Sequence, residues 1–136
     1  MMPSRFRDQL TEVCGGKLVI TLDFEGHCLT MYTLPDWERV ESTLLNMPTL
    51  NPATRRLQRM VLGYSAEVEM DSSGRIGVPP LLREKVNLDK KIMLVGLGKK
   101  FEIWSEDVWS QKFEDWIEEG PVTADQLPES VQTLVF

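Results

Sequence analysis

The apolar positions of this chain fall into short alternating runs separated by turn-forming residues, which is the pattern of half-buried β-strands. Six runs predict strands, at residues 17–22, 28–34, 65–70, 75–78, 91–97 and 100–105. Residues 23–27 form the predicted turn between the first two strands, and Gly98-Lys99 forms the predicted turn between the last two. The pattern therefore favours a mainly β domain.

Helical spacing of apolar residues appears between these runs. The predicted helices cover residues 3–13, residues 35 to the Met47-Pro48 break, residues 52–62 with Asn51 as cap, residues 79–86 and residues 106–119. We expect inward-facing stripes on three of them. These are Trp37, Val40, Leu44 and Leu45 on the second, Leu57, Met60 and Val61 on the third, and Val108, Trp109, Phe113, Trp116 and Ile117 on the last.

A tight turn joins the third and fourth predicted strands. Asp71 and Gly74 suit the first and last positions of a type I turn, with two serines between them. Arg75 follows directly, and its side chain is placed to reach back to the Asp71 carboxylate and brace the turn. Pro79 ends the following strand and suits the first turn of a helix.

The chain contains an internal repeat of this region. Residues 2–10 match residues 78–86 at a constant offset, with apolar, proline, apolar, arginine and acidic positions in register. The match continues with small length changes, from residues 18–20 to 92–94 and from 29–32 to 101–104. Two copies of one unit predict a pseudo-twofold domain, since a solenoid needs three or more repeats.

Composition and charge narrow the class of protein. The 136 residues suffice for one domain, and no apolar run approaches a membrane span or a signal peptide, so we expect a cytoplasmic protein. The net charge of −6 is uneven, because residues 101–136 hold nine acids and one base while residues 1–100 hold twelve acids and fourteen bases. The weakly basic front of the chain is compatible with nucleic-acid binding on one face.

Signals for catalysis or metal binding are weak. His27 is the only histidine and lies in a predicted turn, and Gly96-Leu97-Gly98 lacks the rest of a phosphate-binding loop. Cys14 and Cys28 are too few and too far apart for a metal site or a disulfide framework, so we expect buried free thiols. We therefore expect no enzyme activity, cofactor, metal or small-molecule substrate.

Three segments together resemble the MraZ family of bacterial regulators, which are built from two SpoVT/AbrB-type β modules. They are the run D-x-x-G-R-[apolar]-x-[apolar]-P-x-x-[apolar]-R-E from Asp71, the half-repeat P-S-R-F-R-D-Q-L from Pro3, and R-R-L-Q-R-M-V-L-G from Arg55. The resemblance covers residues 2 to about 119. It implies an α+β fold, mainly β with flanking helices, in which swapped hairpins form a double-split β-barrel.

The resemblance also implies a domain organisation. Residues 1–37 and 65–109 would be the two modules, residues 38–64 the connecting helices, and residues 110–136 a C-terminal helix with an acidic tail. Family members carry a D-x-x-x-R motif in each half, and the first normally precedes the M-P-S-R-F-R segment. This sequence starts at Met1-Met2-Pro3, so that motif is absent and we expect a truncated start.

The function implied by the resemblance is transcriptional regulation. Family membership implies sequence-specific binding of double-stranded DNA at repeated promoter boxes, by a homo-oligomeric ring of octamer-like size. The expected role is repression of the protein's own division and cell-wall operon, in the cytoplasm and associated with the nucleoid. No membrane is expected to take part.

Arginine is the apt residue type for such a contact, because its planar fork can engage guanine O6 and N7 or bridge phosphates. The expected DNA-binding residues, in decreasing order, are Arg75 with Asp71 bracing its turn, then Arg83, Arg7 and Arg5. Alternatives stay open for each. Arg75 could only brace the turn, and Arg7 and Arg83 could only pair locally with Asp8 and Glu84. Arg55, Arg56 and Arg59 fit a solvated helix face.

A second class of function remains open, a protein-interaction or structural ring module without DNA activity. The acidic tail, the aromatic residues of the last helix and the missing first motif favour it, although those aromatics also suit simple core packing. Salt dependence separates the two classes, because phosphate contacts weaken steeply with salt and apolar interfaces do not.

Overall fold

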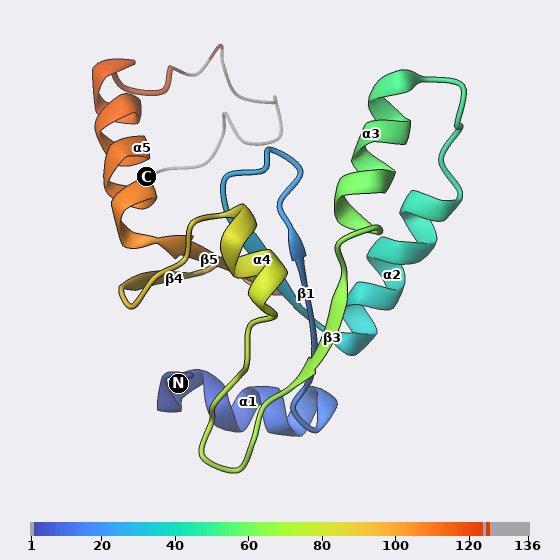
Figure 1. Ribbon diagram of the computed structural model, residues 1–136, viewed down its shortest axis with the longest axis vertical. Helices are drawn as coiled ribbons and strands as arrows, with labels where there is room; N and C mark the ends of the chain where they lie inside the picture. Colours follow the sequence, from blue (N-terminus) through green and yellow to red (C-terminus); the bar gives the residue numbers. More distant parts are fainter. Residues whose placement is uncertain (1, 124, 126–136) are drawn as a thin grey trace. The chain divides into compact units, whose positions relative to one another are not determined.

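The computed structural model describes residues 2–123 and residue 125, without the side chains of residues 5, 9 and 12–14. The chain forms two units, residues 1–106 and residues 107–136. Among the described residues, the first unit holds five strands and four helices (Figure 1). The second holds the remaining helix, α5 (Glu106–Glu118), which begins at the boundary.

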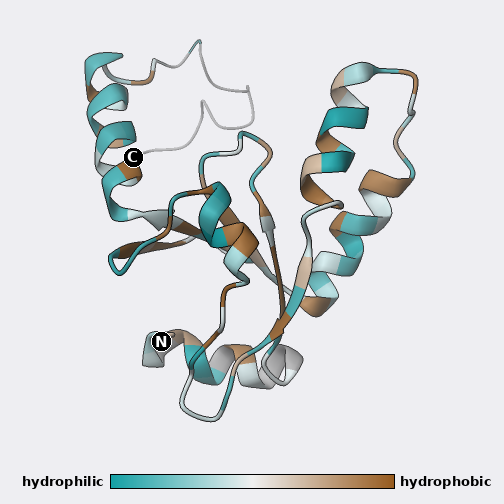
Figure 2. Ribbon diagram, viewed as in Figure 1, coloured by the Kyte–Doolittle hydropathy of each residue, from teal (hydrophilic) through white to brown (hydrophobic). Residues whose placement is uncertain are grey.

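The first unit is built on one antiparallel sheet. Its strands are β1 (Lys17–Leu22), β2 (Leu29–Thr33), β3 (Ala66–Glu69), β4 (Ile92–Gly96) and β5 (Lys100–Ser105), in the order β3-β1-β2-β5-β4. Among the described residues β3 and β4 are the two edges, so the sheet is open and the closed barrel expected from the sequence is not formed. The fold class is α+β, with helices flanking the sheet. Hydrophobic residues, brown in Figure 2, make up most of β4.

The helices divide between the two faces of the sheet. On one face, residues from α1 (Ser4–Cys14) and α4 (Pro80–Lys85) join the larger apolar core with the strand residues Leu18, Ile20 and Met31. Phe6 of α1 meets Phe101 of β5 edge to face, with ring centroids 5.0 Å apart. The other face packs against a helical hairpin of α2 (Leu34–Leu45) and α3 (Pro52–Val61).

The hairpin is held by specific contacts as well as by packing. Gln58 Nε2 donates a hydrogen bond of 2.7 Å to the carbonyl oxygen of Leu44, joining the two helices. The buried hydroxyl of Thr21 on β1 donates to the carbonyl of Val61 at the end of α3. Asn51 caps α3 by accepting the Ala53 N–H at 2.8 Å, as the sequence predicts. The Thr21 bond ties the hairpin to β1, and the other two bonds hold the hairpin itself together.

The pairing of β2 with β5 joins the β1–β2 hairpin to the β4–β5 hairpin. Thr30 lies opposite Glu102, and Leu29 and Met31 lie opposite Ile103 and Phe101. The two segments that the sequence repeat matches therefore pair with each other, and the matched residues Thr30 and Glu102 lie directly opposite. In the outer pairs Leu18 lies opposite Thr33, and Ile92 lies opposite Ser105.

Two local expectations are wrong. Residues 75–78 form no strand in the described structure, although Ile76 and Val78 do pack against the core. Alternation within a segment gives it a buried side, but a strand also needs a neighbouring edge to bond with. Leu45 is 64% exposed, because Leu44 and Leu45 point about 100° apart on α2 and only Leu44 faces the sheet.

The expectation that the last helix buries its aromatic side is also wrong. No residue of α5 is buried, and Phe113, Trp116 and Ile117 are 51%, 44% and 63% exposed. Within the helix the rings of Trp109 and Trp116 meet edge to face at 5.7 Å. The end of the expected acidic tail, residues 126–136, lies outside the described residues. Within the described part of the chain, no helix is long and apolar enough to cross a membrane.

Candidate nucleic-acid interface

The turn after β3 is closed by the backbone and by one carboxylate. The Gly74 N–H donates to the Asp71 carbonyl at 3.0 Å, and the Asp71 N–H donates to the Arg75 carbonyl at 2.9 Å. Asp71 Oδ1 accepts the N–H groups of Ser73 at 2.9 Å and of Arg75 at 2.8 Å. The sequence predicted the turn correctly but not its brace, because Asp71 is held to the Arg75 backbone and not to its guanidinium.

The hydrogen bonds within the turn determine which of its polar groups remain available. One oxygen of the Asp71 carboxylate already receives two N–H donors, so its role is to hold the loop closed. The Arg75 side chain is exposed and has no ion-pair or hydrogen-bond partner among the described residues. A rigid loop thus presents a guanidinium whose five donors are free to meet an external acceptor.

Gly74 is the point where the first helix meets this turn. Its φ of +79° lies in the left-handed region, which glycine adopts without strain. A Cβ at Gly74 would collide with the Arg7 guanidinium, with Arg7 Cδ and Cζ at 2.8 Å and Nε closer still. The Met2 N–H also donates to the Gly74 carbonyl at 2.6 Å, and Arg7 Nη2 donates to the Met2 carbonyl at 3.0 Å. Arg7 is therefore packed flat against the turn.

The expected site residues thus fall into different environments. Arg75 and Asp71 are exposed in the turn, and Arg83 is exposed in α4. Arg7 is partly buried against Gly74, and its Nε has no partner and no contact with solvent. Neither Arg7 nor Arg83 forms the local ion pair considered from the sequence, in the part of the chain that is described. Arg5 lies in α1, and its side chain lies outside the described residues.

Comparison with known proteins identifies the family. The family model described as "MraZ protein, putative antitoxin-like" matches residues 61–126. The chain is 48% identical over 124 residues to the transcriptional regulator MraZ of Thioalkalivibrio sulfidiphilus, covering 91% of this chain and 82% of the relative. It is 42% and 45% identical to the proteins of that name from Halorhodospira halophila and Coxiella burnetii, covering 98% of this chain and 88% of each relative.

The chain belongs to the MraZ family.

The segment that the MraZ family model matches can be located in the structure. Residues 61–126 contain β3, the Asp71–Arg75 turn, α4, the β4–β5 hairpin and α5. Sequence reasoning found this segment from its motif but missed the Arg7–Gly74 contact. The glycine at position 74 was a sign that another group packs closely there. The sequence alone did not show that this group is the Arg7 guanidinium.

A buried polar cluster of this MraZ-family chain also escaped sequence reasoning. Asp23, Cys28 and Glu102 each place one potential ligand atom within 4.8 Å of the others. Asp23 and Cys28 come from the β1–β2 turn and Glu102 comes from β5, so no spacing along the chain relates Glu102 to the other two. Glu102 also accepts a hydrogen bond of 3.1 Å from the Trp104 indole.

This cluster keeps Cys28 protonated. Cys28 is fully buried and free, as the sequence predicts, whereas the Cys14 side chain lies outside the described residues. Burial, followed by the negative charges of Asp23 and Glu102, raises the pKa of the Cys28 thiol far above its ordinary value. An inert thiol is the result, because the thiolate is the nucleophile and the metal ligand.

We expect Cys28 to resist iodoacetamide in the native protein. In a Cys14→Ser variant at about pH 8, native labelling measured by mass spectrometry should be roughly 100-fold slower than labelling after unfolding. Because the native state keeps this proton where the unfolded chain loses it, the free energy of unfolding should fall as pH rises above 9.0. Cys28→Ala should remove that part of the decline, and rapid native labelling would contradict the assignment.

Proposed function

We propose that this MraZ-family chain is a sequence-specific DNA-binding transcriptional regulator. One observation carries the proposal, the Asp71–Arg75 turn, whose own polar groups are paired within the loop while the Arg75 guanidinium is exposed and unpaired among the described residues. The relatives named as transcriptional regulators, at 42–49% identity, support the same reading.

In the proposed mechanism the turn enters a groove of the duplex and Arg75 reads base edges. Its fork matches the O6 and N7 acceptors of guanine, which gives base discrimination, whereas Arg83 on α4 contributes to phosphate binding. Arg7 acts through its packing on Gly74, because its guanidinium is partly buried there and less available to DNA. Asp71 contributes by fixing the backbone of the turn.

The finer elements of the proposal rest on the family resemblance. We propose repression of the protein's own division and cell-wall operon through repeated promoter boxes, by a homo-oligomeric ring of octamer-like size. A ring would multiply weak contacts, since linked sites bind with a high effective concentration. The open edges at β3 and β4 are compatible with strand addition that completes the swapped-hairpin barrel. The β2–β5 register, which pairs Thr30 with Glu102, supports two copies of one unit.

An anisotropy titration tests the function. The native chain should bind labelled DNA from upstream of its own operon roughly 10³-fold more tightly than a scrambled duplex. Affinity should fall between about 50 and 200 mM salt, with a slope that counts the phosphates contacted. Equal binding of the two duplexes would contradict sequence-specific recognition, and no binding at either salt would contradict DNA binding altogether.

The second candidate function is a protein-interaction module. The observation that favours it is the exposed apolar side of α5, where Phe113, Trp116 and Ile117 lie within one helix. Complexes formed through such a surface should persist at salt concentrations that dissociate phosphate contacts. The salt series therefore separates the two candidates.

A further inference from the structure

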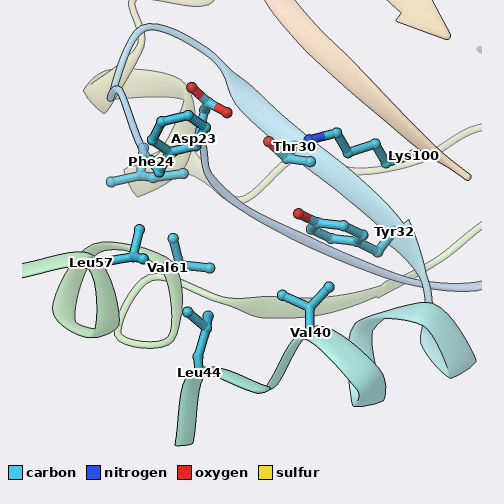
Figure 3. A pocket seen from close by; sticks show the side chains of 10 residues that line it. Asp23, Phe24, Thr30, Tyr32, Val40, Leu44, Leu57, Val61 and Lys100 are labelled. Atoms are coloured by element: carbon cyan, nitrogen blue, oxygen red, sulfur yellow. The ribbon is translucent and has the colours of Figure 1, made fainter. Parts of the chain in front are cut away.

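A cavity of about 350 Å³ lies between the sheet and the α2–α3 hairpin, within the first unit. Figure 3 shows side chains entering it from three sides: the sheet, the helical hairpin, and the turn between β1 and β2. It is separate from the Asp71–Arg75 turn, none of whose residues lines it. The cavity is large enough for a small organic molecule, the size range in which ligand sites begin.

The helical wall of the cavity is apolar. Val40 and Leu44 come from α2, and Leu57 and Val61 come from α3 (Figure 3). Leu44 and Val61 belong to the buried core beneath the hairpin, whereas Val40 and Leu57 are partly buried and pack against it. Branched side chains of this kind favour an aliphatic group, because transfer of its CH₂ groups from water to an apolar wall is favourable. Phe24, at 58% exposure, lies at the rim.

The sheet side of the cavity is polar and carries both signs of charge. Thr30 and Tyr32 of β2 and Lys100 of β5 project from the strands, and Lys100 lies opposite Tyr32 in the register. Asp23 adds a carboxylate from the turn. Burial, together with the charges of Asp23 and Glu102, raises the pKa of Tyr32, so its hydroxyl remains a hydrogen-bond donor.

The charged groups are not satisfied by one another. Asp23 Oδ2 accepts the Glu25 N–H at 3.1 Å, and neither Asp23 nor Lys100 forms an ion pair among the described residues. A ligand of one charge would match one of these groups and repel the other. A molecule with an ammonium and a carboxylate on the same carbon atom matches both, and its aliphatic part can occupy the apolar wall.

We propose that this cavity is a binding site for a small amphipathic zwitterion, an α-amino acid with an aliphatic side chain. Its carboxylate binds the Lys100 ammonium and the Tyr32 hydroxyl, and its ammonium binds the Asp23 carboxylate. The Thr30 hydroxyl, which can donate or accept, completes the polar head. The side chain lies against Val40, Leu44 and Leu57.

Isothermal titration calorimetry of the full chain tests the site, with L-leucine as the probe. Saturable one-to-one binding is expected. 4-Methylpentanoic acid lacks the ammonium and 3-methylbutylamine lacks the carboxylate, so each should bind at least about tenfold more weakly. Glycine lacks the aliphatic group and should lose affinity to a similar extent. An absence of saturable L-leucine binding, or equal binding of all four compounds, would overturn the proposal.

Variants locate the binding in this cavity. Lys100→Met keeps the aliphatic stem and removes the charge, and it should weaken L-leucine binding at least about tenfold. The matched control is Lys99→Met, since Lys99 lies in the β4–β5 turn and does not line this cavity. Leu57→Phe should fill the apolar wall and abolish binding, with thermal unfolding as a check of the fold. Unchanged binding in Lys100→Met would overturn the site.

Discussion

Arg75→Ala is expected to abolish the discrimination between promoter and scrambled DNA while leaving the oligomeric state of the protein unchanged. The guanidinium is exposed at the end of a turn whose closure uses backbone groups and the Asp71 carboxylate. Truncating Arg75 would therefore remove the proposed DNA contact without removing a contact of the fold. A good bidentate arginine–guanine pair contributes about 1–3 kcal/mol of discrimination. Repetition of the loss in each subunit of a ring would multiply its effect on binding.

The measurement is the anisotropy titration, run beside size-exclusion chromatography. Arg56→Ala is the matched control, since Arg56 is exposed on α3 and its replacement changes the net charge equally. Arg75→Lys keeps the charge but not the fork, so it should retain non-specific affinity and lose base discrimination. Arg75→Ala protein that binds the promoter as tightly as the parent would refute the role given to this residue.

Gly74→Ala is expected to destabilise the protein more than the addition of a methyl group at any other position of this loop. A left-handed φ costs a non-glycine residue about 1–2 kcal/mol, and the new Cβ must also displace Arg7 from the turn. We expect a loss of roughly 2–4 kcal/mol in the free energy of unfolding, measured by chemical denaturation, together with weakened DNA binding. Gly77→Ala is the control, because Gly77 has an ordinary φ and open space around its Cβ position.

A double-mutant cycle with Arg7→Ala separates the two costs of Gly74→Ala. If the collision with Arg7 contributes, the glycine substitution should be less damaging in the Arg7→Ala background, and the remainder measures the backbone strain. Equal costs in both backgrounds would mean that Arg7 moves aside freely. In that case Arg7 would not hold the turn, and a direct DNA contact from Arg7 would become the better explanation of its position.

Much of the fold follows from local sequence. β1 and β5 match their expected ranges residue for residue, and the Asn51 cap starts α3 as predicted. These elements agree because alternation, capping and turn chemistry act over a few residues. The wrong predictions depend on contacts with residues that lie elsewhere in the sequence. Residues 75–78 alternate as a strand should, but whether they join a sheet depends on a free edge that their own sequence does not supply.

In the candidate site, too, the local features were predictable and the contacts between distant residues were not. The Asp71–Gly74 turn was predictable because Asp71 can reach the N–H groups that follow it within one short loop. The carboxylate of Glu102 near Cys28 was not predictable, since only the pairing of β2 with β5 brings Glu102 there. Neither was the packing of Arg7 on Gly74, which joins the first copy of the repeat to the turn that precedes the second copy.

The position of β2 in the sheet has a consequence for the protein during its synthesis. β2 is the central strand of five, yet its second neighbour, β5, is translated much later, and Leu29 pairs with Ile103. A nascent chain that ends before residue 100 therefore carries β2 with one edge unpaired and its apolar side chains without their partners on β5. Such a chain offers a surface on which chaperones or other nascent chains can bind. Nearly the whole first unit must therefore be synthesised before its sheet can be completed.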